Sequence, residues 1–157
     1  MWLPILALAA SLGAGEPEPG RGVADPIAFV AERYRLYQSG ERGHGALADH
    51  ASARLLRQLD GFEAAMGGQE LDSLDVWIDD RDGWALSGLG LTLEPGGAAG
   101  RQTITARFRN EGRPVLLRFH FVRERGRWYL DEVVKPGRGG WALTRRLATR
   151  PTAPPNP

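Results

Sequence analysis

Carboxylates are the side chains of this sequence that come nearest to forming a chemical site. Five aspartates lie in the stretch from Asp72 to Asp82, and a calcium loop needs such oxygen ligands at alternate positions with a closing glutamate. Asp80, Asp82 and Gly83 fit three positions of a calcium loop, but Ile78 occupies the first position and no glutamate closes the loop. We therefore interpret the stretch as a solvated loop between strands and predict no metal site.

Asp82 and Asp131 are the candidates for a general base. Burial in an apolar pocket raises the pKa of a carboxyl group toward the range that proton abstraction needs, and Tyr34 or Tyr37 would then be its partner. Strand alternation instead places Asp131 on the face opposite Leu130, where a surface ion pair is the ordinary role. We assign no catalytic residue and keep an enzyme with a pocket carboxylate as an alternative.

Other reactive groups are scarce or scattered. The chain has no cysteine, which excludes disulfides, a thiolate nucleophile, a thiolate metal site and a lipid-anchored cysteine. His44, His50 and His120 are not spaced as zinc ligands on one helix face. Ser87 lacks the glycine two residues before it that a nucleophile elbow needs. No phosphate-binding glycine loop is present, so we predict no cofactor.

Acidic and basic residues are nearly equal in number but unevenly spread. The formal net charge is +1, residues 15–99 hold 15 acidic and 7 basic side chains, and residues 100–157 hold 4 acidic and 13 basic ones. The imbalance is compatible with an electropositive surface on the second half. We favour mutual neutralisation of two halves that fold together, and the net charge argues against a nucleic-acid partner.

The amino terminus has the pattern of an export signal. Residues 1–14 are apolar and end in small residues, although no lysine or arginine precedes the apolar run. We expect cleavage near Ala14, a periplasmic or secreted protein, and no membrane span after cleavage, because the run is too short to cross a bilayer. Residues 15–24 read as a flexible linker and residues 150–157 as a disordered, proline-rich tail, which leaves one domain over 25–149.

Helical signals come before strand signals along the domain. Asp25 and Pro26 open the first helix, Gly40 ends it, a short helical piece covers 46–49, and Ser52 caps the next helix. Period-two segments then follow at 71–78, 84–93, 101–110, 114–123 and 127–134, with a last short element at 141–147. The order predicts an α+β domain with N-terminal helices packed on a curved antiparallel sheet.

The expected hairpin turns fix the register of the last strands. A turn at Glu111-Gly112 and one at Arg125-Gly126 would bury one apolar face, with the pairs Phe108–Val115, Ala106–Leu117, Ile104–Phe119 and Phe121–Leu130. The opposite face would carry Arg107, Arg118, His120, Tyr129 and Asp131. We expect His120 to lie opposite Asp131 there, so that the carboxylate raises the pKa of the imidazole.

The same residues carry a resemblance to a known family. The order of helices and strands, with Trp128-Tyr129-Leu130-Asp131-Glu132-Val133 in the last long strand, resembles the nuclear transport factor 2-like superfamily. More narrowly, residues 25–147 resemble domain of unknown function 3828, an exported bacterial family with an Asp-x-x-x-x-Ala-Gln-Asp stretch. Residues 75–82 stand in that place, with Asp80 for the alanine and Arg81 for the glutamine. The resemblance implies a cone-shaped fold with a pocket between helices and sheet, and no established activity.

These observations lead to a binding function as the first hypothesis. We expect a non-catalytic module that holds a small apolar ligand or an envelope protein, with a ligand-binding set of Tyr34, Trp77, Asp82, Trp84 and Asp131. Two alternatives remain, the enzyme with a pocket carboxylate and a pure interaction partner that uses the sheet face. That face would also make a homodimer through Leu116, Val122 and Tyr129.

Overall fold

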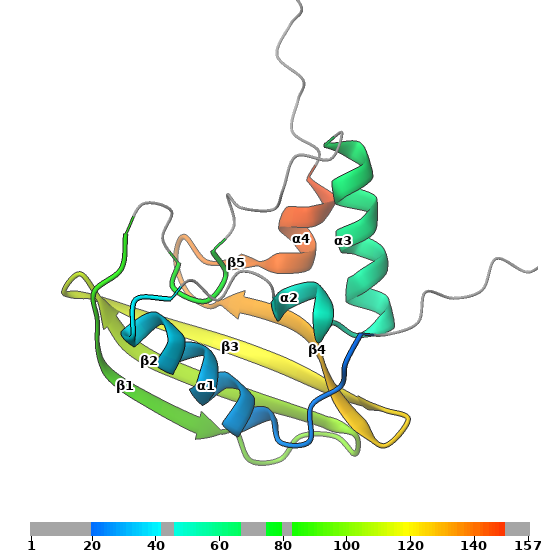
Figure 1. The fold of residues 1–157 in the computed structure, drawn as a ribbon, viewed down its shortest axis with the longest axis horizontal. Helices are drawn as coiled ribbons and strands as arrows, with labels where there is room; N and C mark the ends of the chain where they lie inside the picture. The colour runs from blue at the N-terminus through cyan, green and yellow to red at the C-terminus, as the bar shows by residue number, and fades with distance from the viewer. Residues whose placement is uncertain (1–19, 42–45, 67–74, 80–82, 150–157) are drawn as a thin grey trace, which may run out of the picture.

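Helices precede strands in the computed structural model, which describes residues 20–41, 46–66, 75–79 and 83–149. The helices are α1 (Pro26–Gln38), α2 (Ala46–Asp49), α3 (Ala53–Ala65) and α4 (Leu143–Ala148). The strands are β1 (Leu86–Leu93), β2 (Arg101–Asn110), β3 (Arg113–Glu124), β4 (Arg127–Lys135) and β5 (Trp141–Ala142). They form one curved antiparallel sheet in the order β1-β2-β3-β4-β5 (Figure 1). The expected α+β class is confirmed.

The helix ends form where their capping residues predict them. The Asp25 carboxylate accepts hydrogen bonds from the backbone N–H groups of Ile27 at 3.0 Å and Ala28 at 3.3 Å. The chain leaves α1 through Gly40, whose φ of 84° favours a residue without Cβ. Ser52 begins α3 in the same way, because its hydroxyl accepts from the Leu55 N–H at 3.1 Å.

The two hairpins have the expected turns and the expected register. Glu111 and Arg125 have φ values of 49°, and Gly112 and Gly126 have φ values of 78° and 80°. Positive φ at both central residues defines the turn that matches the twist of antiparallel strands. The four predicted apolar pairs are all present, namely Phe108–Val115, Ala106–Leu117, Ile104–Phe119 and Phe121–Leu130.

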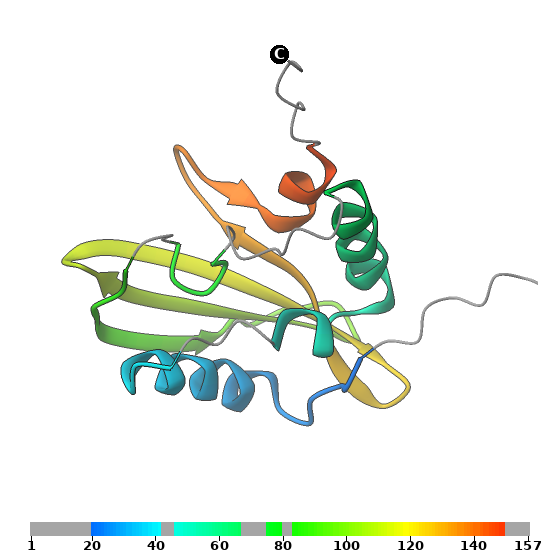
Figure 2. The same cartoon turned by 45° about the horizontal axis from the view of Figure 1, so that its top comes forward.

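The apolar face of the sheet is buried against α1. Val30, Tyr34 and Tyr37 on α1 are at most 1% exposed, and the Tyr34 ring lies 5.1 Å from the Phe108 ring. In both views α1 runs along one face of the sheet, while α3 and α4 gather at the β4–β5 end (Figures 1 and 2). Leu55, Leu59, Leu143 and Leu147 complete the core there.

One predicted strand is wrong where the structure describes it. The prediction covered 71–78, of which 71–74 lie outside the described residues, and residues 76–79 form a turn. The Asp75 carboxylate explains the turn, because it accepts from the Trp77 N–H at 3.1 Å and so competes with a strand ladder. Val76, Trp77 and Ile78 are consecutively buried instead of alternating between two faces.

The predicted linker ends earlier along the chain than expected. Val23 pairs with Trp128 at the margin of β4, with N–H···O distances of 2.8 and 3.0 Å. Arg127 also donates from Nε and Nη2 to the Gly22 carbonyl at 2.9 and 2.7 Å. Residues 20–24 are therefore part of the fold. The expected signal segment 1–14, the linker residues 15–19 and the tail 150–157 lie outside the described residues.

Candidate functional site

Tyr34 and Trp77, two of the predicted ligand-binding residues, pack against each other in the core. The Tyr34 hydroxyl donates to the Trp77 carbonyl at 2.8 Å, and the Trp77 ring stacks on Phe119 at 5.0 Å. Burial, with smaller contributions from Tyr37 and Asp75, raises the pKa of Tyr34 well above its ordinary value. The Tyr34 hydroxyl is therefore a neutral hydrogen-bond donor that holds residues 76–79 against α1.

The remaining predicted residues do not join them in one described cavity. The Trp84 indole N–H donates to the Tyr37 carbonyl at 2.8 Å, which fixes the chain entering β1 against the end of α1. Asp82 lies outside the described residues. Asp131 is held by a different set of residues, at the start of α3.

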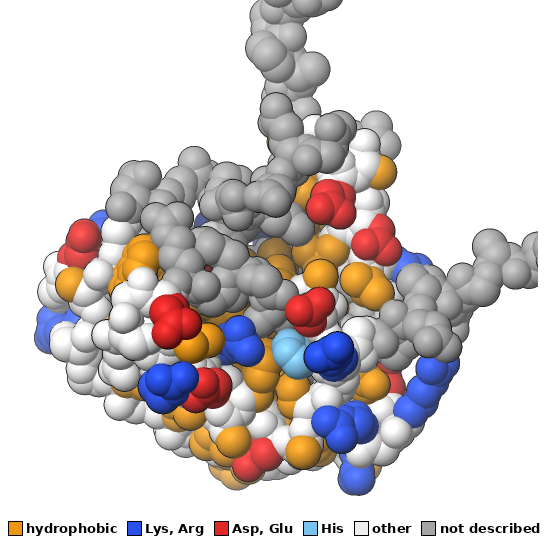
Figure 3. All heavy atoms as spheres, viewed as in Figure 1, with side chains coloured by type: hydrophobic (Ala, Val, Ile, Leu, Met, Phe, Trp, Pro, Cys, Tyr) orange, Lys and Arg blue, Asp and Glu red, His pale blue; other side chains and the backbone are white. Residues whose placement is uncertain are grey.

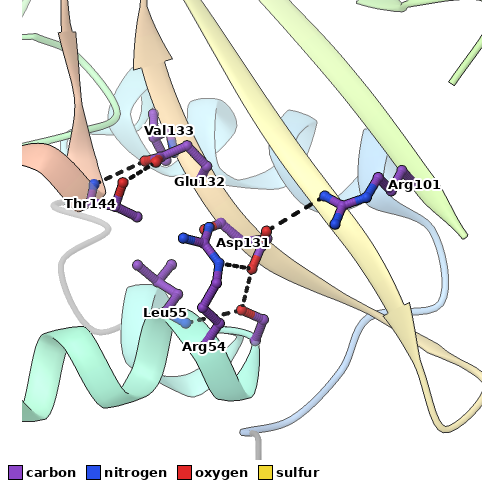
Figure 4. Close-up of polar contacts among 8 residues, drawn as sticks. Arg54, Leu55, Arg101, Asp131, Glu132, Val133 and Thr144 are labelled. Carbon is purple, nitrogen blue, oxygen red and sulfur yellow. Dashed lines mark hydrogen bonds and ion pairs between the residues drawn. The ribbon is translucent and has the colours of Figure 1, made fainter. Parts of the chain in front are cut away.

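Asp131 joins three elements of the fold. Its carboxylate accepts from the Ser52 hydroxyl at 2.6 Å and from Arg54 Nε at 2.9 Å, and the Asp131 carbonyl accepts from Arg54 Nη2 at 2.6 Å. Arg101 reaches it from β2, with 3.8 Å between Nη1 and Oδ2 (Figure 4). The predicted surface ion pair thus exists, but Asp131 is only 7% exposed and ties β4 to β2 and α3.

The electrostatics of Asp131 oppose a role as a general base. Burial acts to raise the pKa of its carboxyl group, but hydrogen bonds from Arg54 and Ser52 and the charges of Arg54 and Arg101 outweigh burial and lower the pKa. A base that works near neutral pH needs a raised pKa. Asp131 is a structural anion with its oxygen atoms already engaged.

Neighbouring Glu132 has a related structural role. Its Oε1 accepts from the backbone N–H groups of Val133 and Thr144, both at 3.0 Å, and its Oε2 accepts from the Thr144 hydroxyl (Figure 4). The carboxylate therefore supplies acceptors to the first turn of α4, where Ala142 offers no side-chain cap.

The predicted pair of His120 and Asp131 is wrong. A register shift follows His120, which lies opposite Glu132, while Phe121 lies opposite Leu130, so Asp131 is the extra residue of a β-bulge. The His120 ring nitrogen Nδ1 instead lies 2.9 Å from the Thr103 hydroxyl. Burial lowers the pKa of His120 against the opposing charges of Glu132 and Glu94, so the predicted rise is also wrong.

Tyr129 is not the open-face residue that the dimer hypothesis requires. It is 6% exposed, and a Cβ atom added to Gly22 would lie 2.7 Å from the Tyr129 Cζ atom. The segment that precedes α1 therefore covers Tyr129 within the same chain, and the absence of a side chain at Gly22 allows the close approach. Leu116 and Val122 remain half-buried on the face away from α1.

A depression of about 400 Å³ lies on the sheet, lined by Gly88 of β1, residues 107–109 of β2 and residues 114–116 of β3. Arg107 and Arg109 alternate with Phe108, which packs on α1, so their side chains lie on the opposite face of the sheet. In β1 the register shifts between Ser87 and Gly90, and Gly90 lies opposite Arg107. Glycines at 88 and 90 leave that part of β1 without side chains, which accounts for the hollow.

The charges at this depression are unlike those elsewhere on the same face. Among the described residues, the Arg107 side chain makes no ion pair or hydrogen bond, and Arg109 donates only to the Gly112 carbonyl at 2.8 Å. In contrast, Arg118 lies 3.0 Å from Glu94, and Arg101 lies near Asp131. The expected neutralisation between chain halves therefore holds for Arg118 but not for Arg107 and Arg109.

The side of the molecule that carries α1 differs in character. Figure 3 shows acidic and basic side chains there with apolar ones between them, and several Lys or Arg side chains at the lower right. Glu32 and Arg35 on α1 form one exposed pair at 2.7 Å. Arg107 and Arg109 on the opposite face differ from Arg35, because no described acidic side chain pairs with them.

Sequence reasoning missed two groups of contacts that close the β4–β5 end. Arg54 had no assigned role, and its pairing with Asp131 required the position of α3. Asp79 accepts from Lys135 Nζ at 2.5 Å and from the Trp141 indole at 2.7 Å. Asp79 and Lys135 lie 56 positions apart in the sequence, and nothing in the sequence pairs them.

Comparison with protein-family models, curated proteins and solved structures found no match to the chain. Within the described ranges, no three histidine, aspartate or glutamate side chains gather as ligands for a metal ion. No helix in those ranges is long and apolar enough to cross a membrane. The site must therefore be interpreted from its own geometry.

Proposed function

We propose that this protein is an exported, non-catalytic binding module that receives its partner in the depression formed by Gly88, residues 107–109 and residues 114–116. The observation that carries the proposal is the combination of an apolar hollow with Arg107 and Arg109, whose charges no described residue neutralises. A volume of about 400 Å³ lies in the range of ligand sites. Export rests on the apolar pattern of residues 1–14.

The proposed fold family is nuclear transport factor 2-like, and within it domain of unknown function 3828. Support comes from helices that precede a curved antiparallel sheet, with α1 lying along its apolar face. Tyr34, Trp77 and Phe119 fill the described space between α1 and the sheet. We therefore move the proposed binding site from the interior, where the sequence suggested it, to the opposite face of the sheet.

The enzyme alternative receives no support from the described carboxylates. Asp131 is engaged by Ser52 and Arg54 with a lowered pKa, and Asp79 is engaged by Lys135 and Trp141. Neither carboxylate faces the depression that contains Arg107. A binding role needs only the positive charges of Arg107 and Arg109 and no proton transfer.

The proposal is tested by titrating isotope-labelled protein with phenylacetate, a small probe with one apolar ring and one carboxylate. We expect amide shifts that centre on Gly88, Arg107, Arg109 and Leu116. Phenylethylamine, which carries the opposite charge on a similar ring, is the matched control and should leave these amides unchanged. Shifts that centre elsewhere, or equal shifts with both probes, would contradict the proposed site.

A further inference from the structure

We propose that the natural occupant of the depression is an extended, acidic segment of a partner protein, which adds to β1 as a further strand. This inference rests on the proposed function, since it names the kind of partner for the same site. Three observations carry it: the open edge of β1, the two unneutralised arginines, and the glycines that separate them from that edge.

The first observation is that the two edges of the sheet differ. At the β4 edge, Val23, Ala51 and β5 together pair with the strand along its length. At the other edge, β1 pairs with β2, and no described segment pairs with its outer side. The N–H and C=O groups on that side are therefore available to an added strand.

The second observation is that β1 carries none of the side chains that usually protect an edge strand. Its sequence Leu-Ser-Gly-Leu-Gly-Leu-Thr-Leu has neither a charged residue nor a proline, and these are common devices against edge pairing. Its bulge is confined to the part between Ser87 and Gly90, so residues 90–93 keep a regular ladder. Leu93, 47% exposed, offers apolar contact at the end of that regular part.

The third observation concerns the reach of charged side chains over β1. Gly90 lies opposite Arg107, so no side chain stands between Arg107 and the position that an added strand would occupy. Adjacent strands are about 4.8 Å apart, which puts that position about 10 Å from β2. A glutamate and an arginine can span this gap from its two sides. Arg107 lies opposite Gly90 at the start of the regular ladder, and Arg109 lies opposite Ser87 beyond the bulge, so carboxylates of one added strand would meet the two arginines on the two sides of the bulge.

Charge also separates this occupant from a second copy of the chain. A second β1 would pair edge to edge, but it carries no carboxylate and would leave Arg107 and Arg109 unneutralised. An acidic segment neutralises both arginines, and charge-assisted hydrogen bonds to carboxylates are the strong class. An acidic segment is therefore the partner that can both pair with the edge of β1 and neutralise the arginines of the depression.

The test uses the full chain and three synthetic seven-residue peptides. The first alternates valine and glutamate, the second replaces each glutamate with lysine, and the third replaces each valine with proline. Proline keeps the charge but removes the N–H donors that a strand ladder uses. Amide shifts across β1 and β2 should appear with the first peptide only.

Charge-reversal variants complete the test. Arg107→Glu and Arg109→Glu should each weaken binding of the valine–glutamate peptide about tenfold, since a lost charge-assisted contact of about 1.4 kcal/mol corresponds to that factor. Arg145→Glu on the exposed part of α4 changes the net charge equally and should change affinity less than about twofold, within the range of screened surface charge. Circular dichroism confirms that each variant is folded.

The outcomes separate this inference from the proposed function. Phenylacetate binding without peptide binding would overturn the acidic strand and leave the depression as a small-ligand site. Equal binding of the proline peptide would overturn strand addition, and equal binding of the lysine peptide would overturn charge recognition. A dimer whose β1 amides shift with protein concentration, with no response to any peptide, would replace the acidic partner by a second copy.

Discussion

The Ser52 hydroxyl donates to the Asp131 carboxylate at 2.6 Å, a contact between residues 79 positions apart. The same hydroxyl oxygen accepts from the Leu55 N–H at 3.1 Å at the start of α3. One side chain therefore caps a helix and attaches that helix to the bulge of β4. Asp131 is the extra residue of that bulge and has no opposite residue on β3, so the residue that anchors the start of α3 also marks the register shift.

Replacing Ser52 should test this double role. Ser52→Ala removes the helix cap and the hydrogen bond to a buried carboxylate. Loss of the cap should lower the free energy of unfolding by about 1 kcal/mol, and loss of the hydrogen bond by about 1.5–3 kcal/mol. Asp25→Ala is the matched control, because Asp25 caps α1 on an exposed surface and has no second contact of this kind. Equal losses for the two variants, measured by urea denaturation, would show that the Asp131 contact adds nothing.

Asp131 should make the domain less stable in acid. Its folded pKa lies below the ordinary value of 3.8, so the folded state favours the charged form. The resulting stabilisation is present above the unfolded pKa and is lost as pH falls through the folded one. Urea denaturation between about pH 7 and 2.5 should show a smaller acid loss in Asp131→Asn than in the parent. An equal loss of stability in Asp131→Asn and in the parent would show that other carboxylates cause the acid sensitivity.

His120 should titrate below its ordinary pKa of 6.5, because burial opposes its protonation. With the folded pKa lowered, its contribution to stability is present above the unfolded pKa and is lost as pH falls through the folded pKa. An NMR titration of the ring protons measures the midpoint directly. A midpoint above 6.5 would show that the charges of Glu132 and Glu94 outweigh the burial of the His120 ring.

The segment before α1 should contribute to stability. A chain that begins at Gly20 keeps the Val23–Trp128 pairing and the bonds from Arg127 to the Gly22 carbonyl, whereas a chain that begins at Ala24 loses both. We expect the shorter chain to be less stable by about 1–3 kcal/mol, on the usual scale of a few hydrogen bonds. Thermal denaturation of the two chains compares them, and equal midpoints would make this segment dispensable.

Sequence reasoning succeeded where the signal is local. Asp25 and Ser52 predicted two helix starts, and the two turns with glycine second predicted the register that pairs Phe108 with Val115. It failed where contacts between residues far apart in the sequence determine the local structure. The bulge at Asp131 depends on Ser52 and Arg54, and the turn at 76–79 depends on Asp75 and on Tyr34 from α1.

The depression could be anticipated only in part from the sequence. Gly88 and Gly90 did indicate a bulge or bend, and the arginines of β2 did fall on the polar face. Which arginines remain unneutralised depends on where Glu94 and Asp131 lie after folding. The sequence could not show that Tyr34 and Trp77 pack on Phe119 in the core while Asp131 lies apart from them with Ser52 and Arg54, because these contacts join residues far apart in the chain.

The most direct test of the binding site fills the hollow without disturbing the fold. A Cβ added to Gly90 meets no atom within 4 Å, so Gly90→Phe places a ring over β1 beside Arg107. A strand favours phenylalanine over glycine, so the melting temperature should not fall. We predict that the folded variant loses binding of both phenylacetate and the valine–glutamate peptide in NMR titrations. Unchanged binding of both probes by a folded Gly90→Phe domain would contradict a site at this depression.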